Sequence, residues 1–179
     1  LVGSEMCIRD RLGDEGKDDY VKFLKSDNVK GYMNAYTQSF TYENENGRDQ
    51  LVVLVVPENE KEFTEYIDLF VEKQFKKDRH YNLDGIMITK KLDEIRPKDK
   101  TDIELRDSDL VETRIKPDRV VDNYIGHFVF MTKKTYEETF NKKYETNSYY
   151  IKLNDVSKKD ELIADLRKNK SILSVVDFT

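Results

Sequence analysis

Cysteine and long apolar runs are scarce in this sequence of 179 residues. The longest purely aliphatic run is Leu51–Val56, which Pro57 closes, whereas a helix that crosses a bilayer needs about 20 apolar residues. We therefore expect that no part of the chain spans a membrane. The single cysteine, Cys7, leaves no pair for a disulfide and no set of thiolates for a metal site.

Histidine is scarce as well, since only His80 and His127 offer an imidazole. They lie in different expected elements, without the HxH or HExxH spacing of a metal-binding pair. Glycine-rich nucleotide motifs, a Walker loop and a GxSxG nucleophile motif are also absent from the sequence. The sequence thus predicts no catalytic residue, no metal ligand and no cofactor site, and we expect that the chain is not an enzyme.

The charge balance argues against nucleic acid as a partner. The chain has 31 Lys and Arg against 36 Asp and Glu, a net charge of −5, and the two signs are interspersed. Phosphate binding needs a concentrated basic face, which this arrangement does not provide. With 37% hydrophobic and 11% aromatic residues, the chain is predicted to be globular with a heavily charged surface.

The first eleven residues, LVGSEMCIRDR, contain the cysteine. Along their whole length they resemble the translation of a transposase-based sequencing adapter. The resemblance implies that residues 1–11 are not natural protein and that the natural sequence begins near Leu12. Processing scars carry no information on a fold, so this stretch is left out of the expected architecture.

Alternating aromatic residues predict a long strand in the first third of the chain. Four of them fall on even positions: Tyr32, Tyr36, Phe40 and Tyr42. A period of two places them on one face of a strand, which is either packed beneath a helix or a platform for a ligand; we favour packing. The Asn46-Gly47 turn signal then leads into a buried β-branched strand at Gln50–Val56.

Helix starts carry capping residues at four places: Asn59, Thr89, Thr132 and Ser157. Side chains of these types accept hydrogen bonds from the free N–H groups of a first helical turn, and Asn59 and Ser157 are followed three residues later by an acidic residue, as in a capping box. Another short helix is expected around Tyr20–Leu24. By contrast, Val71–Leu83 has no clean period and is predicted to be a loop or a frayed helical extension.

Further strands are expected at Gly85–Ile88, Thr101–Arg106, Val111–Lys116, Arg119–Met131, Tyr149–Leu153 and Ile172–Phe178. Within the fourth of these, with a bend at Gly126, three aromatic residues either pack in the core or form a contact surface: Tyr124, Phe128 and Phe130. These elements predict an α+β fold with mixed or antiparallel sheets and three to five short helices. We expect one domain over residues 12–179, with a subdomain at 80–145 inserted between 12–79 and 146–179.

Four segments occur in the order of a known family: Val52–Leu69 (VVLVVPENEKEFTEYIDL), Asp84–Ile95 (DGIMITKKLDEI), Val120–Phe140 (VVDNYIGHFVFMTKKTYEETF) and Asn147–Leu153 (NSYYIKL). They resemble the extracytoplasmic domain of FtsX-like, MacB-like ABC transporter permeases, most specifically at Asn123–Met131. The resemblance implies a fold like the MacB periplasmic core. The stretch Arg96–Thr101 (RPKDKT) departs from the family, whose members usually carry a Gly-Asp turn there.

By this resemblance, the chain is expected on the outer face of the cell membrane as part of a longer permease. A cytoplasmic ATP-binding subunit would be its partner through transmembrane helices outside this sequence, and a second permease copy or an extracellular peptide or lipid substrate would be another. Leu12 and Thr179 would then emerge close together. Two alternatives stay open: a secreted or surface-attached adhesion module, and a hydrolase with its site at His80 or His127 beside carboxylates.

Overall fold

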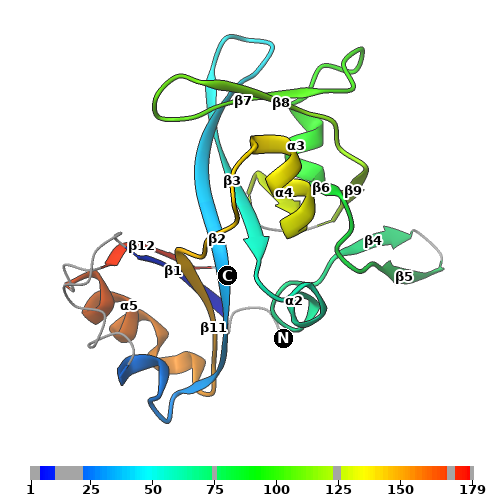
Figure 1. Ribbon diagram of the computed structural model, residues 1–179. Helices are drawn as coiled ribbons and strands as arrows, with labels where there is room; N and C mark the ends of the chain where they lie inside the picture. The colour runs from blue at the N-terminus through cyan, green and yellow to red at the C-terminus, as the bar shows by residue number, and fades with distance from the viewer. Residues whose placement is uncertain (1–4, 11–21, 74–75, 123–125, 169–171, 178–179) are drawn as a thin grey trace. The chain divides into compact units, whose positions relative to one another are not determined.

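The computed structural model describes residues 5–10, 22–73, 76–122, 126–168 and 172–177. The chain divides into two compact units (Figure 1): unit 1 combines residues 1–35 and 146–179, and unit 2 is the middle segment, residues 36–145. The subdomain boundaries near residues 80 and 145 that the sequence suggests stay a prediction. The assignment of residues 12–179 to a single domain stays a prediction, and both Leu12 and Thr179 lie outside the described residues.

Unit 1 is a sheet with a helix packed against it. Its strands are β1 (Glu5–Asp10), the first part of β2 (Val29–Glu43), β11 (Ser148–Leu153) and β12 (Ile172–Asp177). Their order is β12-β1-β11-β2 with every neighbouring pair antiparallel, so β11 and β12 run in the same direction. Apolar residues of β11, β12 and the helix α5 (Lys159–Arg167) form one core cluster: Ile151, Leu153, Ile163, Leu166, Ile172 and Val175, together with Leu24.

Strand β1 comes from the stretch that resembles an adapter translation. It pairs antiparallel with β11 on one side and β12 on the other, and the side chain of Cys7 is buried. Residues 5–10 therefore take part in the sheet of unit 1, although the expected architecture left this stretch out. The physical reason is that a β-ladder is made by backbone N–H and C=O groups, which every residue except proline offers. The adapter origin itself stays a hypothesis.

The start of α5 differs from the prediction. A 3₁₀ turn, η1 (Val156–Lys158), precedes the helix, and Asp155 caps that turn. The backbone N–H and the hydroxyl of Ser157 donate to Asp155 Oδ1 over 2.9 and 2.6 Å, and these hydrogen bonds lower the pKa of Asp155. Ser157 is therefore not the cap of α5, because its hydroxyl is a donor to the residue that caps the preceding turn.

Unit 2 is built on a mixed sheet with the order β2-β3-β10-β6-β9. Strand β10 (Phe128–Met131) runs parallel to β3 (Asp49–Pro57) and antiparallel to β6 (Ile86–Thr89), and β6 runs parallel to β9 (Arg119–Val121). A hairpin of β7 (Ile103–Arg106) and β8 (Glu112–Ile115) joins β2 through the pair Thr41–Arg106. The remaining elements are α2 (Glu60–Tyr66), α3 (Lys90–Glu94), α4 (Lys133–Phe140) and the separate pair β4 (Phe70–Lys73) and β5 (Lys76–His80). Mixed sheets and short helices confirm the predicted α+β class.

Two of the predicted caps form as expected in unit 2. Asn59 Oδ1 accepts from the backbone N–H groups of Lys61 and Glu62 over 3.0 and 3.3 Å at the start of α2. Thr132 Oγ1 accepts from the N–H of Thr135 over 3.3 Å at the start of α4. Because β3 and β10 are parallel neighbours, α2 and α4 both follow strands that end at the same edge of the sheet.

Thr89 occupies the N-cap position of α3 but makes no capping hydrogen bond. Its hydroxyl donates to the carbonyl of Gly126 and accepts from the N–H of Phe128, each over 3.0 Å. The side chain therefore ties the end of β6 to the start of β10. The predicted helix is present, and the predicted role of this hydroxyl is wrong.

Two other expectations are corrected. Residues 71–83 were expected to be a loop or a frayed helix, but β4 and β5 form an antiparallel hairpin there. A two-stranded ribbon outside the main sheet needs no long apolar period, so the pattern of apolar residues did not predict it.

Residues 119–131 were expected to be one bent strand, but β9 and β10 lie on opposite sides of β6. Gly126, with φ +63°, precedes β10 in a left-handed conformation that glycine adopts without strain.

The two parts of β2 bury opposite sets of positions. Met33, Ala35 and Thr37 are buried in the first part, whereas Phe40 and Tyr42 are buried in the second. The expected period of two therefore holds within each part but shifts between Thr37 and Phe40. None of the helices in the described part of the chain is long and apolar enough to cross a bilayer.

Candidate functional site

The two histidines lie in different surroundings. His80 Nδ1 is 2.7 Å from Asp68 Oδ1, and these side chains are 61% and 58% exposed, so solvent screens the pair. His127 Nδ1 is 3.3 Å from the backbone carbonyl of Leu51. The two imidazoles thus have different partners, a carboxylate for His80 and a backbone carbonyl for His127.

The aromatic stripe of β2 is mostly core. Tyr36 packs 5.0 Å from Tyr136 and Phe40 packs 5.8 Å from Phe140, both measured between ring centroids. Tyr136 and Phe140 belong to α4, so the expectation that the stripe packs beneath a helix is confirmed for these residues. Tyr32 differs, because it belongs to unit 1 and is 44% exposed.

The second aromatic group is also core where it is described. Phe128 and Phe130 are at most 4% exposed, and their rings stack with centroids 5.9 Å apart. Tyr124 lies outside the described residues. Neither Phe128 nor Phe130 is therefore available as a contact surface.

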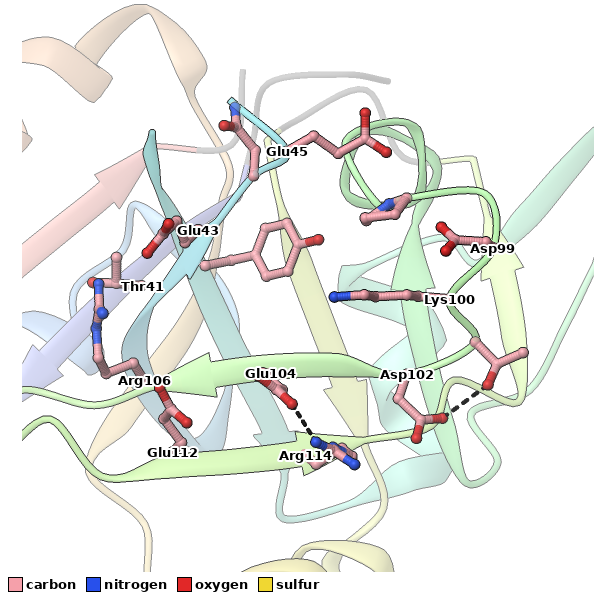
Figure 2. A pocket seen from close by; sticks show the side chains of 14 residues that line it. Thr41, Glu43, Glu45, Asp99, Lys100, Asp102, Glu104, Arg106, Glu112 and Arg114 are labelled. Carbon is pink, nitrogen blue, oxygen red and sulfur yellow. Dashed lines mark hydrogen bonds and ion pairs between the residues drawn. The ribbon is translucent and has the colours of Figure 1, made fainter. Parts of the chain in front are cut away.

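A polar hollow of about 630 Å³ opens on unit 2 (Figure 2). Three segments line it: the end of β2 and its turn, residues 41–45; the loop after α3, residues 97–102; and the β7–β8 hairpin, through Glu104, Arg106, Glu112 and Arg114. The loop after α3 is held in shape by Arg96, which pairs with Asp93 and donates to the carbonyl of Thr101 over 2.6 Å. This loop overlaps the stretch Arg96–Thr101, which departs from the resembled family.

Carboxylates outnumber cations around this hollow. Six acidic residues line it, Glu43, Glu45, Asp99, Asp102, Glu104 and Glu112, against Lys100, Arg106 and Arg114. Both arginines are already paired, Arg114 with Glu104 and Arg106 with Asp49 over 2.9 Å. Five carboxylates of the lining therefore remain against one ammonium group, and Figure 2 shows Lys100 pointing into the hollow.

Tyr42 belongs to both the core and the hollow. Its side chain is only 6% exposed and packs in the core cluster of unit 2, yet it lines the hollow. Its hydroxyl makes no hydrogen bond with the described residues, in contrast to that of Tyr144, which donates to the carbonyl of Val56 over 2.9 Å. Burial is the main cause that raises the pKa of Tyr42, so its phenol stays neutral and can both donate and accept.

The acidic residues of the hollow were not singled out from the sequence. They come from three separated segments, and each reads as an ordinary solvated charge on its own. The only local signal was the departure of Arg96–Thr101 from the family. In the described part of the chain, no three His, Cys, Asp or Glu residues are grouped so that they could hold a metal ion.

No protein-family model and no curated protein sequence matches the chain. Among solved structures, it is similar to the periplasmic region of MacB from Actinobacillus actinomycetemcomitans, at 12% identity and a TM-score of 0.41, over 98% of this chain and 90% of that one. It is similar to the extracellular domain of the noncanonic ABC-type transporter YknZ from Gram-positive bacteria, at 11% identity and a TM-score of 0.43, over 98% and 100%. A putative lipoprotein from Bacillus anthracis has 12% identity and a TM-score of 0.46, over 97% and 96%.

Proposed function

We propose that this chain is the extracytoplasmic domain of an ABC-type permease, which moves or presents a surface to a substrate or partner when a cytoplasmic subunit hydrolyses ATP. The observation that carries the proposal is the set of four segments that resemble the permease family. They correspond to β3 with α2, β6 with α3, β9 and β10 with α4, and β11. The resemblance therefore follows whole strand–helix units instead of scattered positions.

The division of the chain also supports this proposal. Unit 1 contains residues from both end segments, and unit 2 is a single continuous insertion between them. An anchor joined to either end of the chain would therefore act on unit 1. Unit 2 would respond through the two connections at residues 35–36 and 145–146. Movement of one compact body against another is a common form of domain rearrangement, and this division would permit it.

We also propose that the chain carries no reaction centre of its own. A working acid–base pair needs two titratable groups whose environments pull their pKa values apart. His80 pairs with Asp68 where both side chains are more than half exposed, and His127 Nδ1 lies 3.3 Å from a backbone carbonyl. The hydrolase alternative expected a histidine beside perturbed carboxylates in a deep pocket, and the hollow of unit 2 is lined by neither histidine.

The location is tested by labelling a cysteine variant in the complete permease. Leu110 is 73% exposed, and Leu105 on β7 is fully buried. With Cys7 changed to serine, Leu110→Cys is expected to react with a membrane-impermeant maleimide in intact cells, whereas Leu105→Cys is expected to react only after denaturation. Labelling of Leu110→Cys only in broken cells would contradict an extracytoplasmic location.

The complete reading frame separates the permease from the adhesion alternative. Apolar segments of about 20 residues on both sides of the chain are expected for the permease, and a frame without them favours a secreted or surface-attached module.

The coupling of this domain to ATP hydrolysis is tested by co-purification of the complete protein with an ATP-binding subunit. A second test is the effect of ATP on the protection of unit 2 from hydrogen exchange. Identical exchange with and without ATP would refute the coupling while leaving the location untouched.

A further inference from the structure

The hollow of unit 2 combines two features that a plain solvated surface lacks. Its free carboxylates outnumber its free cations, and a tyrosine hydroxyl without a hydrogen-bond partner among the described residues lies in its lining, on a side chain that is only 6% exposed. The hydroxyl of Tyr42 lines the hollow, where it can donate a hydrogen bond to a ligand group or accept one from it. The two features are independent, since one is a charge imbalance and the other an unused hydrogen-bonding group.

The placement of the carboxylates argues for an extended ligand. A metal ion needs several oxygens that converge on one point at about 2.0–2.6 Å, and the described residues hold no such group. Here the carboxylates come from the β2–β3 turn, the loop after α3 and the β7–β8 hairpin, around a space of about 630 Å³ (Figure 2). Separated negative charges around a roomy space complement positive charges that are separated along a flexible chain.

We propose that this hollow binds an organic polycation, with ammonium groups placed along Glu43, Glu45 and Asp99 and one of them at the hydroxyl of Tyr42. The ammonium group donates three hydrogen bonds, so it can serve a carboxylate and the phenol oxygen together. A tyrosine ring also attracts cations through its face. A free polyamine and a lysine-rich peptide segment share this chemistry.

Substitution of Lys100 tests the proposal in the opposite direction, because it should strengthen binding where substitution of a carboxylate weakens it. Its ammonium group points into the hollow (Figure 2) and has no ion-pair partner among the described residues. It therefore competes with a cationic ligand for the same carboxylates. Removal of its charge should strengthen binding of a polycation, whereas it would weaken binding of an anion.

The experiment is calorimetric titration of the chain with spermine at low ionic strength. Glu45→Gln and Asp99→Asn are each expected to weaken binding about twofold to fivefold, the range for exposed ion pairs, and Lys100→Gln is expected to strengthen it by a similar factor. Tyr42→Phe is expected to weaken binding although the ring is kept. The matched control is Glu138→Gln, because Glu138 is an exposed acidic residue of α4 that does not line the hollow; its affinity should equal that of the wild type. Thermal unfolding of each variant checks that the fold is retained.

Two results would overturn the inference. One is equal affinity of Glu45→Gln and Glu138→Gln, which would mean that spermine responds only to the net charge of −5 and not to this hollow. The other is displacement of spermine by Mg²⁺ at the same concentration of charge as effectively as by another polyamine. A parallel titration with a pentalysine peptide assigns the source: tighter binding of the peptide points to a basic peptide segment, and tighter binding of spermine to a free polyamine. Neither arm depends on the permease assignment, because binding is measured on this chain alone.

Discussion

Thr89→Val removes one hydroxyl from the centre of unit 2 and is expected to destabilise it strongly. Thr89 is completely buried, with φ −72° and ψ 149°, a conformation that valine adopts readily. Valine has nearly the same shape, so the change creates no cavity. What is lost are two hydrogen bonds, to the carbonyl of Gly126 and from the N–H of Phe128, each 3.0 Å long.

The magnitude follows from these two bonds. A net hydrogen bond contributes about 0.5–1.5 kcal/mol, and a buried group that loses its partner costs about 1–3 kcal/mol. The bond from Phe128 is buried and the one to Gly126 is partly buried, so we expect a loss of about 2–4 kcal/mol in the free energy of unfolding. For a chain of this size, each kcal/mol lowers Tm by about 2–4 °C.

The assay is urea unfolding followed by far-UV circular dichroism. The midpoint should fall while the slope with urea stays constant, because the surface exposed on unfolding is unchanged. Thr113→Val on β8 is the matched control, since Thr113 is half-buried and its side chain makes no hydrogen bond with the described residues. The control should change stability by less than about 0.5 kcal/mol. If Thr89→Val and Thr113→Val unfold at the same urea concentration, the hydroxyl does not tie β6 to β10 and the reasoning is refuted.

Gly85→Ala should destabilise the chain by about 2 kcal/mol or more in the same assay. Gly85 has φ +56°, and an added Cβ would overlap the carboxylate of Asp118, which accepts a hydrogen bond from the backbone N–H of Ile86. Asn59→Ala should lower stability by about 1 kcal/mol, since it removes the acceptor for the first turn of α2. Tyr144→Phe tests the pH dependence: burial raises the pKa of Tyr144 well above its ordinary value, so its contribution is complete below about pH 10 and is lost as the pH rises through the raised pKa. The variant should therefore unfold with a shallower loss of stability above pH 10.

Each of these three has a matched comparison. Gly47→Ala also places alanine at positive φ, +69°, but its Cβ would meet only Glu43 Oε1 at an ordinary contact distance of 3.8 Å, so it should cost less than Gly85→Ala; an equal cost would show that Asp118 does not matter. Asn59→Asp keeps an oxygen acceptor and should retain most of the stability. If Tyr144→Phe and the wild type lose stability in parallel between pH 9 and 11, the phenol of Tyr144 does not contribute.

Local chemistry predicted much of unit 2. The Asn46-Gly47 turn, the strand β3 and the caps Asn59 and Thr132 all act between residues close in sequence, and such interactions can be recognised without knowing the rest of the fold. Thr89 shows the limit of this reasoning. Its position before α3 was predicted correctly, but its hydroxyl bonds to Gly126 and Phe128, which are far along the chain.

The candidate site was beyond prediction for the same reason. Glu45, Asp99 and Glu112 are each ordinary charged residues in their local sequence, and only the pairing of β7 with β2 and the loop after α3 bring them to one hollow. Tyr42 was expected on a packed face, which is confirmed, but the sequence carried no sign that its hydroxyl would have no hydrogen-bond partner. Its surroundings depend on residues more than fifty positions away.

By itself, the sequence determined the fold class, the alternation of short strands and helices, the caps Asn59 and Thr132, and the resemblance of four segments to a permease domain, because these depend on local periodicity and short-range hydrogen bonds. Only the tertiary structure decided the place of β1 between β11 and β12, the separation of β9 from β10, the division into two units and the gathering of carboxylates beside Tyr42. Strand order and site geometry depend on which distant backbone groups pair, and nothing in a local pattern specifies that choice.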